Sequence, residues 1–383
     1  MTKSKKIKII IVIISISFIQ GLQYCVSPVL NQIQDRFHNV DISLIQMLIT
    51  GPALLSIVIA LLSGVLVVKI SKKKLLIFAG LVAGITGFIP MFIDDFWILF
   101  FSRIVYGISL GLATALNTAV VADFFEGDER VSVMGIQAAS VGAGMVVVNT
   151  VGGILGKTGY INSYKINIIG FISMILIWIF LPDLGKVKVH KSEKIKINKE
   201  VIIVSLFGML EFLFLITFST NIAMHVSGKL AGNSSVIGSL SGVFSGTQIV
   251  IGIILGLITK ITKKYTLPVA MLSFSIGGIL LILFPDSFIF LSLGAIFCGI
   301  SQGVFIPTAM VNVSNAVSSV SVAMASAVFT CAMCFGQLIS PSVLNFITGC
   351  AFNKISTTNV FIISVIGMTI SGIICILWKR KSN

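Results

Sequence analysis

Charged residues are scarce in this chain of 383 amino acids, because they make up 10% of it whereas hydrophobic residues make up 56%. With a mean hydropathy of +1.08, the chain cannot supply the charged surface that keeps a soluble globule in solution. Only three histidines are present, and none forms a Ser-His-Asp or His-Glu pattern along the chain. We therefore expect no enzymatic activity and no metal site.

Nucleotide-binding motifs are also missing. The phosphate-binding pattern G-x4-G-K-[ST] does not occur, so the chain is not expected to hydrolyse ATP itself. The six cysteines lie mostly in apolar stretches without nearby histidine or acid, which is typical of small packing residues. No cofactor is expected.

The chain contains many apolar stretches that are long enough to cross a bilayer. A transmembrane helix needs about 20 apolar residues, and its backbone groups must be hydrogen-bonded within the helix. The sequence predicts an all-α membrane protein with twelve transmembrane helices, at residues 8–30, 44–68, 75–93, 97–122, 132–156, 166–182, 201–225, 235–259, 267–285, 288–312, 320–347 and 357–378.

Basic residues occupy alternate connections between these spans. They gather at the N-terminus, near Lys69, in segment 183–200, near Lys260 and at the C-terminus, whereas the intervening loops hold several acidic residues. This positive-inside pattern predicts a multi-pass protein of the cell membrane with both termini cytoplasmic. The net charge of +14 is thus explained by topology, and without an aromatic platform beside the lysines we expect no nucleic-acid partner.

The second half of the sequence repeats the first. Residues 68–73, VKISKK, align with residues 259–264, TKITKK, at an offset of 191 (260 minus 69). Residues 107–111, GISLG, align with residues 299–303, GISQG, at 192 (299 minus 107). Matches at one offset predict two pseudo-symmetric six-helix bundles of the same orientation.

This repeat also predicts the domain organisation. The first six spans form an N-terminal half at 1–182, a lysine-rich cytoplasmic linker follows at 183–200, and a C-terminal half occupies 201–383. Proteins of this design bind their ligand between the halves, near the middle of the bilayer.

Three stretches resemble motifs of the major facilitator superfamily. Residues 64–73, GVLVVKISKK, are similar to the loop signature G-x-L-a-D-r-x-G-r-k, with Val68 in place of its acid. Residues 103–111, RIVYGISLG, are similar to R-x-x-q-G-x-g in the fourth span. Residues 135–153 resemble the antiporter signature G-x8-G-x3-G-P-x2-G-G with its Gly-Pro replaced, although close helix packing explains such glycines equally well.

The resemblance implies a secondary active transporter that works by alternating access. The antiporter signature favours proton-coupled efflux of amphipathic or drug-like small molecules, driven by the proton gradient. The main alternative is an importer or exporter of a small polar metabolite, such as a sugar, an amino acid or an organic ion. A non-transporting membrane sensor is a further alternative. We expect a monomer whose partners are its small-molecule substrate and membrane lipid.

Two charged residues lie inside the predicted spans, where each charge costs at least about 2.5 kcal/mol. Glu211 lies about 15 Å deep in the seventh span, and Arg103 lies in the fourth. Since a medium of low dielectric constant favours the neutral carboxyl, we expect Glu211 to carry the coupled proton. Arg103 is expected to tune Glu211 or to hold polar parts of the substrate. The alternatives are an acid that orders the bundle and an arginine that bridges helices.

Other polar residues are candidates for substrate binding. Gln20 is the repeat partner of Glu211 (211 minus 191), and it shares one helix face with Gln23 and Tyr24. Further candidates, each of which could instead form a hydrogen bond between helices, are Asn117, Gln137, Asn221, Gln302 and Gln337.

A gating set is expected at the cytoplasmic face and in the fifth span. Lys69, Lys72 and Lys73 are predicted to approach Asp123 and latch the closed cytoplasmic side, as in the resembling family, unless they serve only as lysine anchors. The motif residues complete this set: Gly64, Gly144, Asn149, Gly152 and Gly153.

Overall fold

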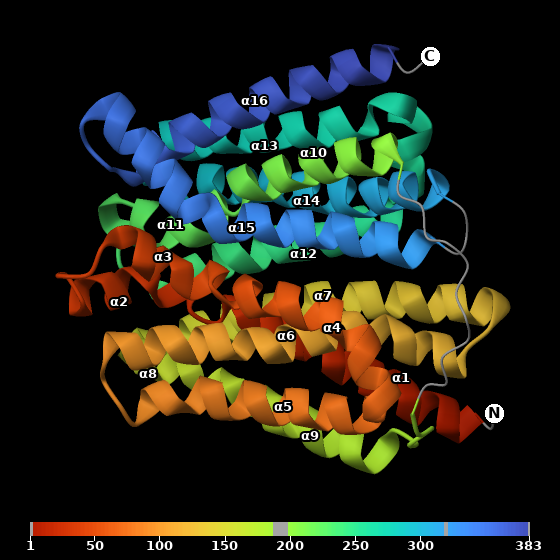
Figure 1. The fold of residues 1–383 in the computed structure, drawn as a ribbon. Coiled ribbons are helices and arrows are strands. Elements are labelled where there is room, and N and C mark those ends of the chain that lie inside the picture. Colours follow the sequence, from red (N-terminus) through yellow and green to blue (C-terminus); the bar gives the residue numbers. More distant parts are fainter. Residues whose placement is uncertain (1–2, 187–197, 318–320, 382–383) are drawn as a thin grey trace.

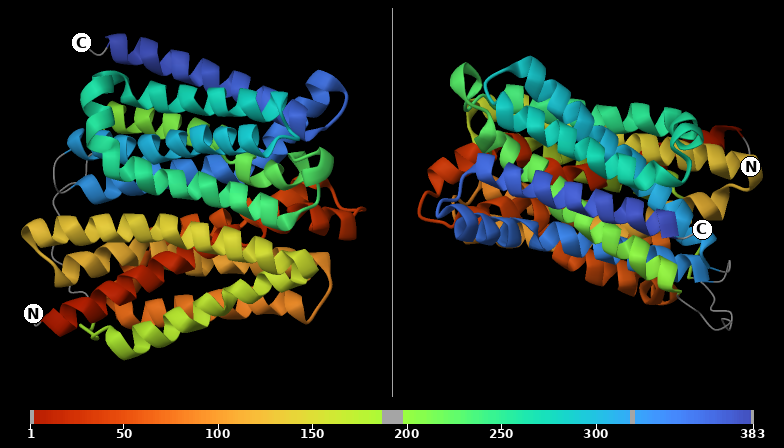
Figure 2. Two further views of the ribbon diagram at one scale, coloured as in Figure 1. Left: turned by 180° about the vertical axis from the view of Figure 1, so that it is seen from behind. Right: turned by 90° about the horizontal axis from the view of Figure 1, so that it is seen from above.

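The structure is a computed structural model that describes residues 3–186, 198–317 and 321–381, and in these ranges it contains helices and no strands. Figure 1 shows two layers of helices, one from each half of the sequence, with both chain ends on the same side. We call that side the terminus end and the opposite side the far end. Figure 2 shows the same two layers from behind.

The first six spans form the lower layer in Figure 1, which we call the N bundle. Three of these spans are interrupted, because short helices or turns split them. The helices are α1 (Lys3–Gly21), α2 (Leu30–Arg36), α3 (Ile42–Thr50), α4 (Pro52–Lys69), α5 (Lys72–Phe88), α6 (Phe96–Phe124), α7 (Gly127–Leu155), α8 (Tyr160–Ser163) and α9 (Ile168–Phe180).

The last six spans form the upper layer, which we call the C bundle. Its helices are α10 (Lys199–Leu215), α11 (Thr217–His225), α12 (Ser234–Thr262), α13 (Thr266–Leu283), α14 (Phe288–Asn315), α15 (Val322–Phe352) and α16 (Thr357–Lys381). The expected linker at 183–200 falls largely outside the described residues.

Twelve spans result, as the hydropathy pattern predicts. Eleven helical stretches in the described part of the chain are long and apolar enough to cross a membrane, and one of them, Ser234–Leu283, is 50 residues long. That stretch contains α12 and α13, which are joined by the turn Lys263–Tyr265. The first span runs further than expected, because helical structure extends over Lys3–Arg36 where the sequence predicts 8–30.

Prolines break the first two spans at their far-end halves. Pro28 and Pro52 each lie at a helix start, where a backbone N–H has no partner within the helix and its absence in proline therefore costs no hydrogen bond. Span one consequently changes from α1 into two short 3-10 turns at 22–24 and 27–29. This break frees backbone carbonyl groups in the middle of the N bundle, where side chains must satisfy them.

Glycine contacts show that the two bundles are built alike. A Cβ atom added to Gly144 would lie 3.1 Å from Cα of Phe18, and one added to Gly336 would lie 3.1 Å from Cα of Met209. These pairs are related by offsets of 192 (336 minus 144) and 191 (209 minus 18). The same 3.1 Å approach to Cα recurs for Gly111 against Ser56 and for Gly303 against Gln248. The sequence repeat is therefore a repeat of helix packing.

The bundles contact each other mainly through α7 against α12 and through α15 against α3 and α4. Hydrogen bonds between them gather at the far end, where Ser27 donates to the carbonyl of Ser219 at 2.8 Å and Ser234 donates to that of Gly153 at 2.8 Å. Nearer the terminus end, Cβ atoms added at Gly135 of α7 or Gly256 of α12 would meet open space. The described conformation is closed at the far end.

Candidate functional site

Glu211 lies inside the C bundle and not on its surface. Its side chain is fully buried, and Oε1 accepts a hydrogen bond of 2.6 Å from the hydroxyl of Ser301 on α14. Among the described residues, Oε2 has no hydrogen-bond partner. Cys298 on α14 and Cys375 on α16 lie near the acid. One oxygen of this carboxyl is therefore held, and the other is available to a proton.

Arg103 on α6 is directed at the broken part of span one. Its Nε donates to the carbonyl of Leu48 at 2.9 Å, and Nη1 donates to that of Leu22 at 3.4 Å. Nη2 donates to the carbonyl of Gln23. The guanidinium also lies 5.0 Å from the ring centre of Tyr106 and is only 2% exposed. These contacts favour the helix-bridging interpretation of Arg103 over substrate binding.

The three polar residues predicted on one face of span one differ in their surroundings. Gln23 donates to the carbonyl of Ile49 at 3.2 Å, so its amide joins spans one and two. Tyr24 is buried and lies near Cys334 of α15, across the boundary between the bundles. The Nε2 atom of Gln20 is buried, and no described residue forms a hydrogen bond with it.

Two further glutamines of the C bundle also carry unpartnered amide atoms. These are Oε1 of Gln302 on α14 and Nε2 of Gln337 on α15. Buried polar groups without partners are rare, and they indicate a place for water or a ligand. Asn117 donates to Ser17 at 2.9 Å, and Gln137 donates to Thr118 at 3.1 Å, so these two amides bond within the N bundle.

A cluster of neutral polar side chains joins the bundles at the far end. Gln46 donates to Oδ1 of Asn221 at 2.7 Å, while Asn345 donates to Oε1 of Gln46 at 2.8 Å and to the hydroxyl of Ser43 at 3.0 Å. We call these four residues the far-end cluster. Asn221, predicted to bind substrate, lies in it. Gln46 and Asn345 were not predicted, although amides inside apolar spans are the sequence signal that could have found them.

The glycines of the antiporter-like motif pack against different neighbours. A Cβ added to Gly153 would lie 2.9 Å from Cα of Gly238 in the C bundle, whereas one on Gly152 would lie 3.1 Å from the hydroxyl of Ser163. Gly144 faces α1, as described above. Asn149 donates to the carbonyl of Met145 at 2.9 Å. Only part of this motif therefore lies at the boundary between the bundles.

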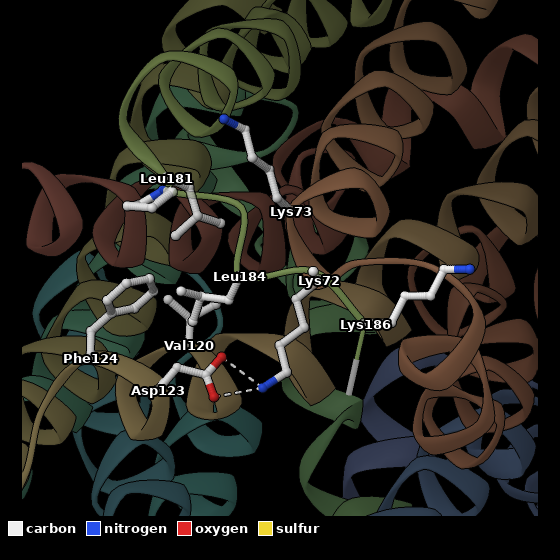
Figure 3. A pocket seen from close by; sticks show the side chains of 10 residues that line it. Lys72, Lys73, Val120, Asp123, Phe124, Leu181, Leu184 and Lys186 are labelled. Atoms are coloured by element: carbon white, nitrogen blue, oxygen red, sulfur yellow. Dashed lines mark hydrogen bonds and ion pairs between the residues drawn. The ribbon is translucent and has the colours of Figure 1, made fainter. Parts of the chain in front are cut away.

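Lysines of the 69–74 loop contact acids of the same bundle. Lys72 forms an ion pair of 2.7 Å with Asp123 at the end of α6 (Figure 3). Ser71 donates to Asp183 at 3.0 Å. The pKa of Asp183 is lowered, chiefly because its carboxylate accepts the backbone N–H of Gly185, with Ser71 and two nearby lysines adding to this.

The other members of the expected latch make no such contact. Lys69, at the end of α4, forms no ion pair in the described part of the chain, and a Cβ added to Gly64 would meet open space. Lys73 lines a pocket that is described below.

An ion pair and a hydrogen bond at Asp94 connect elements of the N bundle at its far end. Arg36 donates twice to Oδ2 of Asp94, at 3.0 and 2.5 Å, and the hydroxyl of Tyr160 donates to Oδ1 at 2.5 Å. These bonds lower the pKa of Asp94, with Arg36 as the largest cause and Tyr160 as the next. The loop before α6 is thereby fastened to spans one and six.

Comparison with known proteins decides the family. A family model described as Major Facilitator Superfamily matches residues 12–224 and 201–383, which together cover almost the entire chain. The chain belongs to the major facilitator superfamily. No curated protein sequence matches it. As a member of this superfamily it is a membrane transporter and not an enzyme.

Solved structures of other transporters share the fold. The crystal structure of the nucleoside transporter NupG has a TM-score of 0.75 and 13% identity, with 96% of this chain and 98% of that chain covered. A peptide transporter POT in complex with sulfate has a TM-score of 0.79 and 11% identity, with 98% and 94% covered. A POT family transporter in complex with a thioalcohol conjugated peptide has 0.77 and 11%, with 97% and 96% covered. Identities this low show the fold alone.

Proposed function

We propose that this transporter is coupled to protons through Glu211. The observation that carries the proposal is a fully buried carboxyl in α10 with one oxygen bound by Ser301 and the other without a partner. A carboxyl inside the membrane favours its neutral form until water reaches it. Alternating exposure of the C bundle interior would therefore let Glu211 take up a proton on one side and release it on the other.

We propose efflux of amphipathic or drug-like small molecules as the transported class. The charged groups inside the spans are already engaged, since Arg103 binds backbone carbonyls and Glu211 lies within the C bundle. What remains for a substrate is apolar surface together with a few neutral amides, a combination typical of sites for amphipathic compounds.

Uptake of a small polar metabolite is the second candidate. The unpartnered amide atoms of Gln20, Gln302 and Gln337 favour it, because a neutral polar substrate could supply their missing hydrogen bonds. The titles of the compared structures name a nucleoside transporter and peptide transporters, which also take polar substrates.

We propose that the terminus end faces the cytoplasm of a cell-membrane protein acting as a monomer. The lysine-rich connections near Lys69 and Lys260 lie on the side that carries both termini, which supports this orientation by the positive-inside rule. The conformation with a closed far end is then the inward-facing one. The halves 1–182 and 201–383 are proposed as the two moving bodies.

The experiment is pH-gradient-driven flux into inverted vesicles, comparing native protein with Glu211→Gln. A panel of fluorescent amphipathic compounds and radiolabelled polar metabolites, nucleosides included, would be supplied. We expect gradient-driven accumulation of one class by native protein and its loss in Glu211→Gln with substrate binding kept. Glu200→Gln, at the exposed start of α10, is the matched control and should transport normally.

The outcomes separate the parts of the proposal. Equal gradient-driven flux in native protein and Glu211→Gln would show that Glu211 is structural. Accumulation of polar metabolites instead of amphipathic compounds would overturn the proposed substrate class and leave the coupling intact.

A further inference from the structure

A pocket of about 200 Å³ lies at the terminus end of the N bundle (Figure 3). It is formed where the start of α5, the end of α6 and the segment after α9 meet. Lys72, Lys73 and Lys186 lie on its polar side, with Asp123. Neither a latch nor lysine anchoring, the two roles predicted for Lys69, Lys72 and Lys73, accounts for a cavity at this place. The apolar wall of the pocket consists of Val120, Phe124, Leu181, Pro182 and Leu184.

Lysines outnumber acids around the pocket in the described part of the chain. Lys72 is neutralised by Asp123 in an ion pair of 2.7 Å, and Figure 3 shows the amines of Lys73 and Lys186 pointing away from that pair. Neither of these two forms an ion pair within the described residues. Asp183, the other acid nearby, accepts hydrogen bonds from Ser71 and from the backbone of Gly185, and its charge partly offsets those of Lys73 and Lys74. Four lysines and two acids thus lie in and beside the pocket, and among the described residues positive charge is in excess.

The start of α5 adds further donors at the same place. The helix begins at Lys72, and the side chain of Ser71 bonds to Asp183 instead of capping the first turn. The first backbone N–H groups of α5 consequently have no side-chain acceptor, which leaves the positive end of the helix dipole open to an anion. Free lysine amines on flexible stems can turn toward the same anion.

The combination of a basic side and an apolar wall selects an amphipathic anion. Leu184, which is 61% exposed, continues the apolar wall toward the end of α9, whose residue Trp178 is 66% exposed. A tryptophan at the end of a span is typical of the membrane interface. The pocket thus lies where the headgroups and the first acyl carbons of a lipid leaflet would be.

We propose that this pocket binds the phosphate headgroup of an anionic phospholipid from the leaflet at the terminus end. The phosphate would contact Lys73, Lys186 and the open start of α5, while the glycerol and upper acyl chains would lie against Leu184 and its apolar neighbours. The bound lipid would hold residues 181–186 against the N bundle. Naming the leaflet cytoplasmic rests on the proposed orientation, whereas the binding site itself does not.

Lipid binding to the full-length protein in neutral detergent tests the proposal without any transport assay. Native mass spectrometry would measure the affinity for phosphatidylglycerol against phosphatidylcholine. Because each lysine near an anionic surface contributes about a factor of five in affinity, we expect Lys73→Gln with Lys186→Gln to weaken phosphatidylglycerol binding about thirtyfold. The matched control is Lys260→Gln with Lys264→Gln, since Lys264 is the repeat partner of Lys73 (73 plus 191).

A second variant, Leu184→Glu, changes the exposed apolar wall and places a negative charge beside the phosphate. It should also weaken phosphatidylglycerol binding by at least tenfold, and binding of phosphatidylcholine should not change. The proposal fails if the pocket variant and the control variant lose affinity equally, because general surface charge would then explain the binding. It also fails if free glycerol phosphate competes as strongly as the lipid, which would identify a soluble phosphate compound as the ligand.

Discussion

Replacing Arg103 by methionine should destabilise the protein without directly removing a substrate contact. Methionine has a similar length and fills the same space, but it cannot donate to the carbonyl groups of Leu22, Gln23 and Leu48. The break in span one frees the carbonyl groups of Leu22 and Gln23, and Pro52 frees that of Leu48 in span two, because proline has no N–H to bond four residues back. Leu22 also accepts the backbone N–H of Cys25, so the loss falls mainly on Gln23 and Leu48. The substitution therefore leaves buried acceptors without partners.

The size of the effect follows from the number of bonds. Interhelical hydrogen bonds in membrane proteins contribute about 0.6 to 1.7 kcal/mol each, so three of them give about 2 to 5 kcal/mol. Such a loss lowers Tm by about 2 to 6 °C in a protein of this size. Arg103→Lys should fall between native protein and Arg103→Met, because one ammonium group cannot span three carbonyls.

The assay is thermal unfolding of purified protein in detergent, combined with substrate affinity measured on the same preparations. Arg130→Met, at an exposed position near the start of α7, is the control for loss of one positive charge and should unfold like native protein. If Arg103→Met unfolds at the native temperature while its substrate affinity falls at least tenfold, then Arg103 binds substrate and the helix-bridging interpretation is wrong.

Three further predictions concern the boundary between the bundles and the far end. Gly238→Ala should lower Tm and slow transport, because its Cβ would lie 2.6 Å from the carbonyl oxygen of Asn149. In the control Gly256→Ala the added Cβ meets open space, and the substitution should raise helix stability by up to about 1 kcal/mol. Thermal unfolding and flux are measured for both variants, and equal behaviour would contradict close packing of α7 on α12. Gln46→Leu should weaken the far-end cluster and open that side more often, so a membrane-impermeant maleimide supplied from the far-end side should label Cys334, which lies near Tyr24 at the boundary between the bundles, several times faster. The control Gln32→Leu removes a bond within the N bundle, to the carbonyl of Gly156, and should leave labelling unchanged; faster labelling in both variants would count against the cluster as the closing element. Finally, the lowered pKa of Asp94 means that its stabilising contact is complete above the ordinary aspartate value of about 3.9 and disappears as pH falls through the lower folded value. The decline of Tm between pH 5 and pH 2.5 should thus be smaller in Asp94→Asn than in native protein, and identical declines would refute the linkage.

The fold could be predicted from the sequence because each span is long and apolar and because the repeat matches residues at one offset. Gly144 and Gly336 align in the sequence, and they make equivalent close contacts in the two bundles. The ends of the spans were less predictable. Span one continues to Arg36, beyond the predicted end at residue 30, because helical turns resume after Pro28.

The surroundings of the predicted site residues could not be read from hydropathy. Arg103 was recognisable as a charge in a span, but its acceptors exist because span one breaks at 22–29 and span two breaks before Pro52, and periodicity reveals neither break. Asn221 was recognisable as a polar residue at membrane depth. Its partner Gln46 lies 175 positions away, and no local pattern connects the two. That Glu211 faces the bundle interior depends on the rotation of α10, and a single acid does not determine this rotation.

The far-end cluster consists of amides and a hydroxyl, namely Gln46, Asn221, Asn345 and Ser43. Ion pairs weaken with salt and with protonation, but hydrogen bonds between neutral groups respond to neither over the physiological range. The free energy needed to separate the bundles at these four residues should therefore change neither with salt concentration nor with pH over the physiological range. The contribution of the far-end cluster to keeping the far end closed should therefore stay constant when the medium around the cell changes.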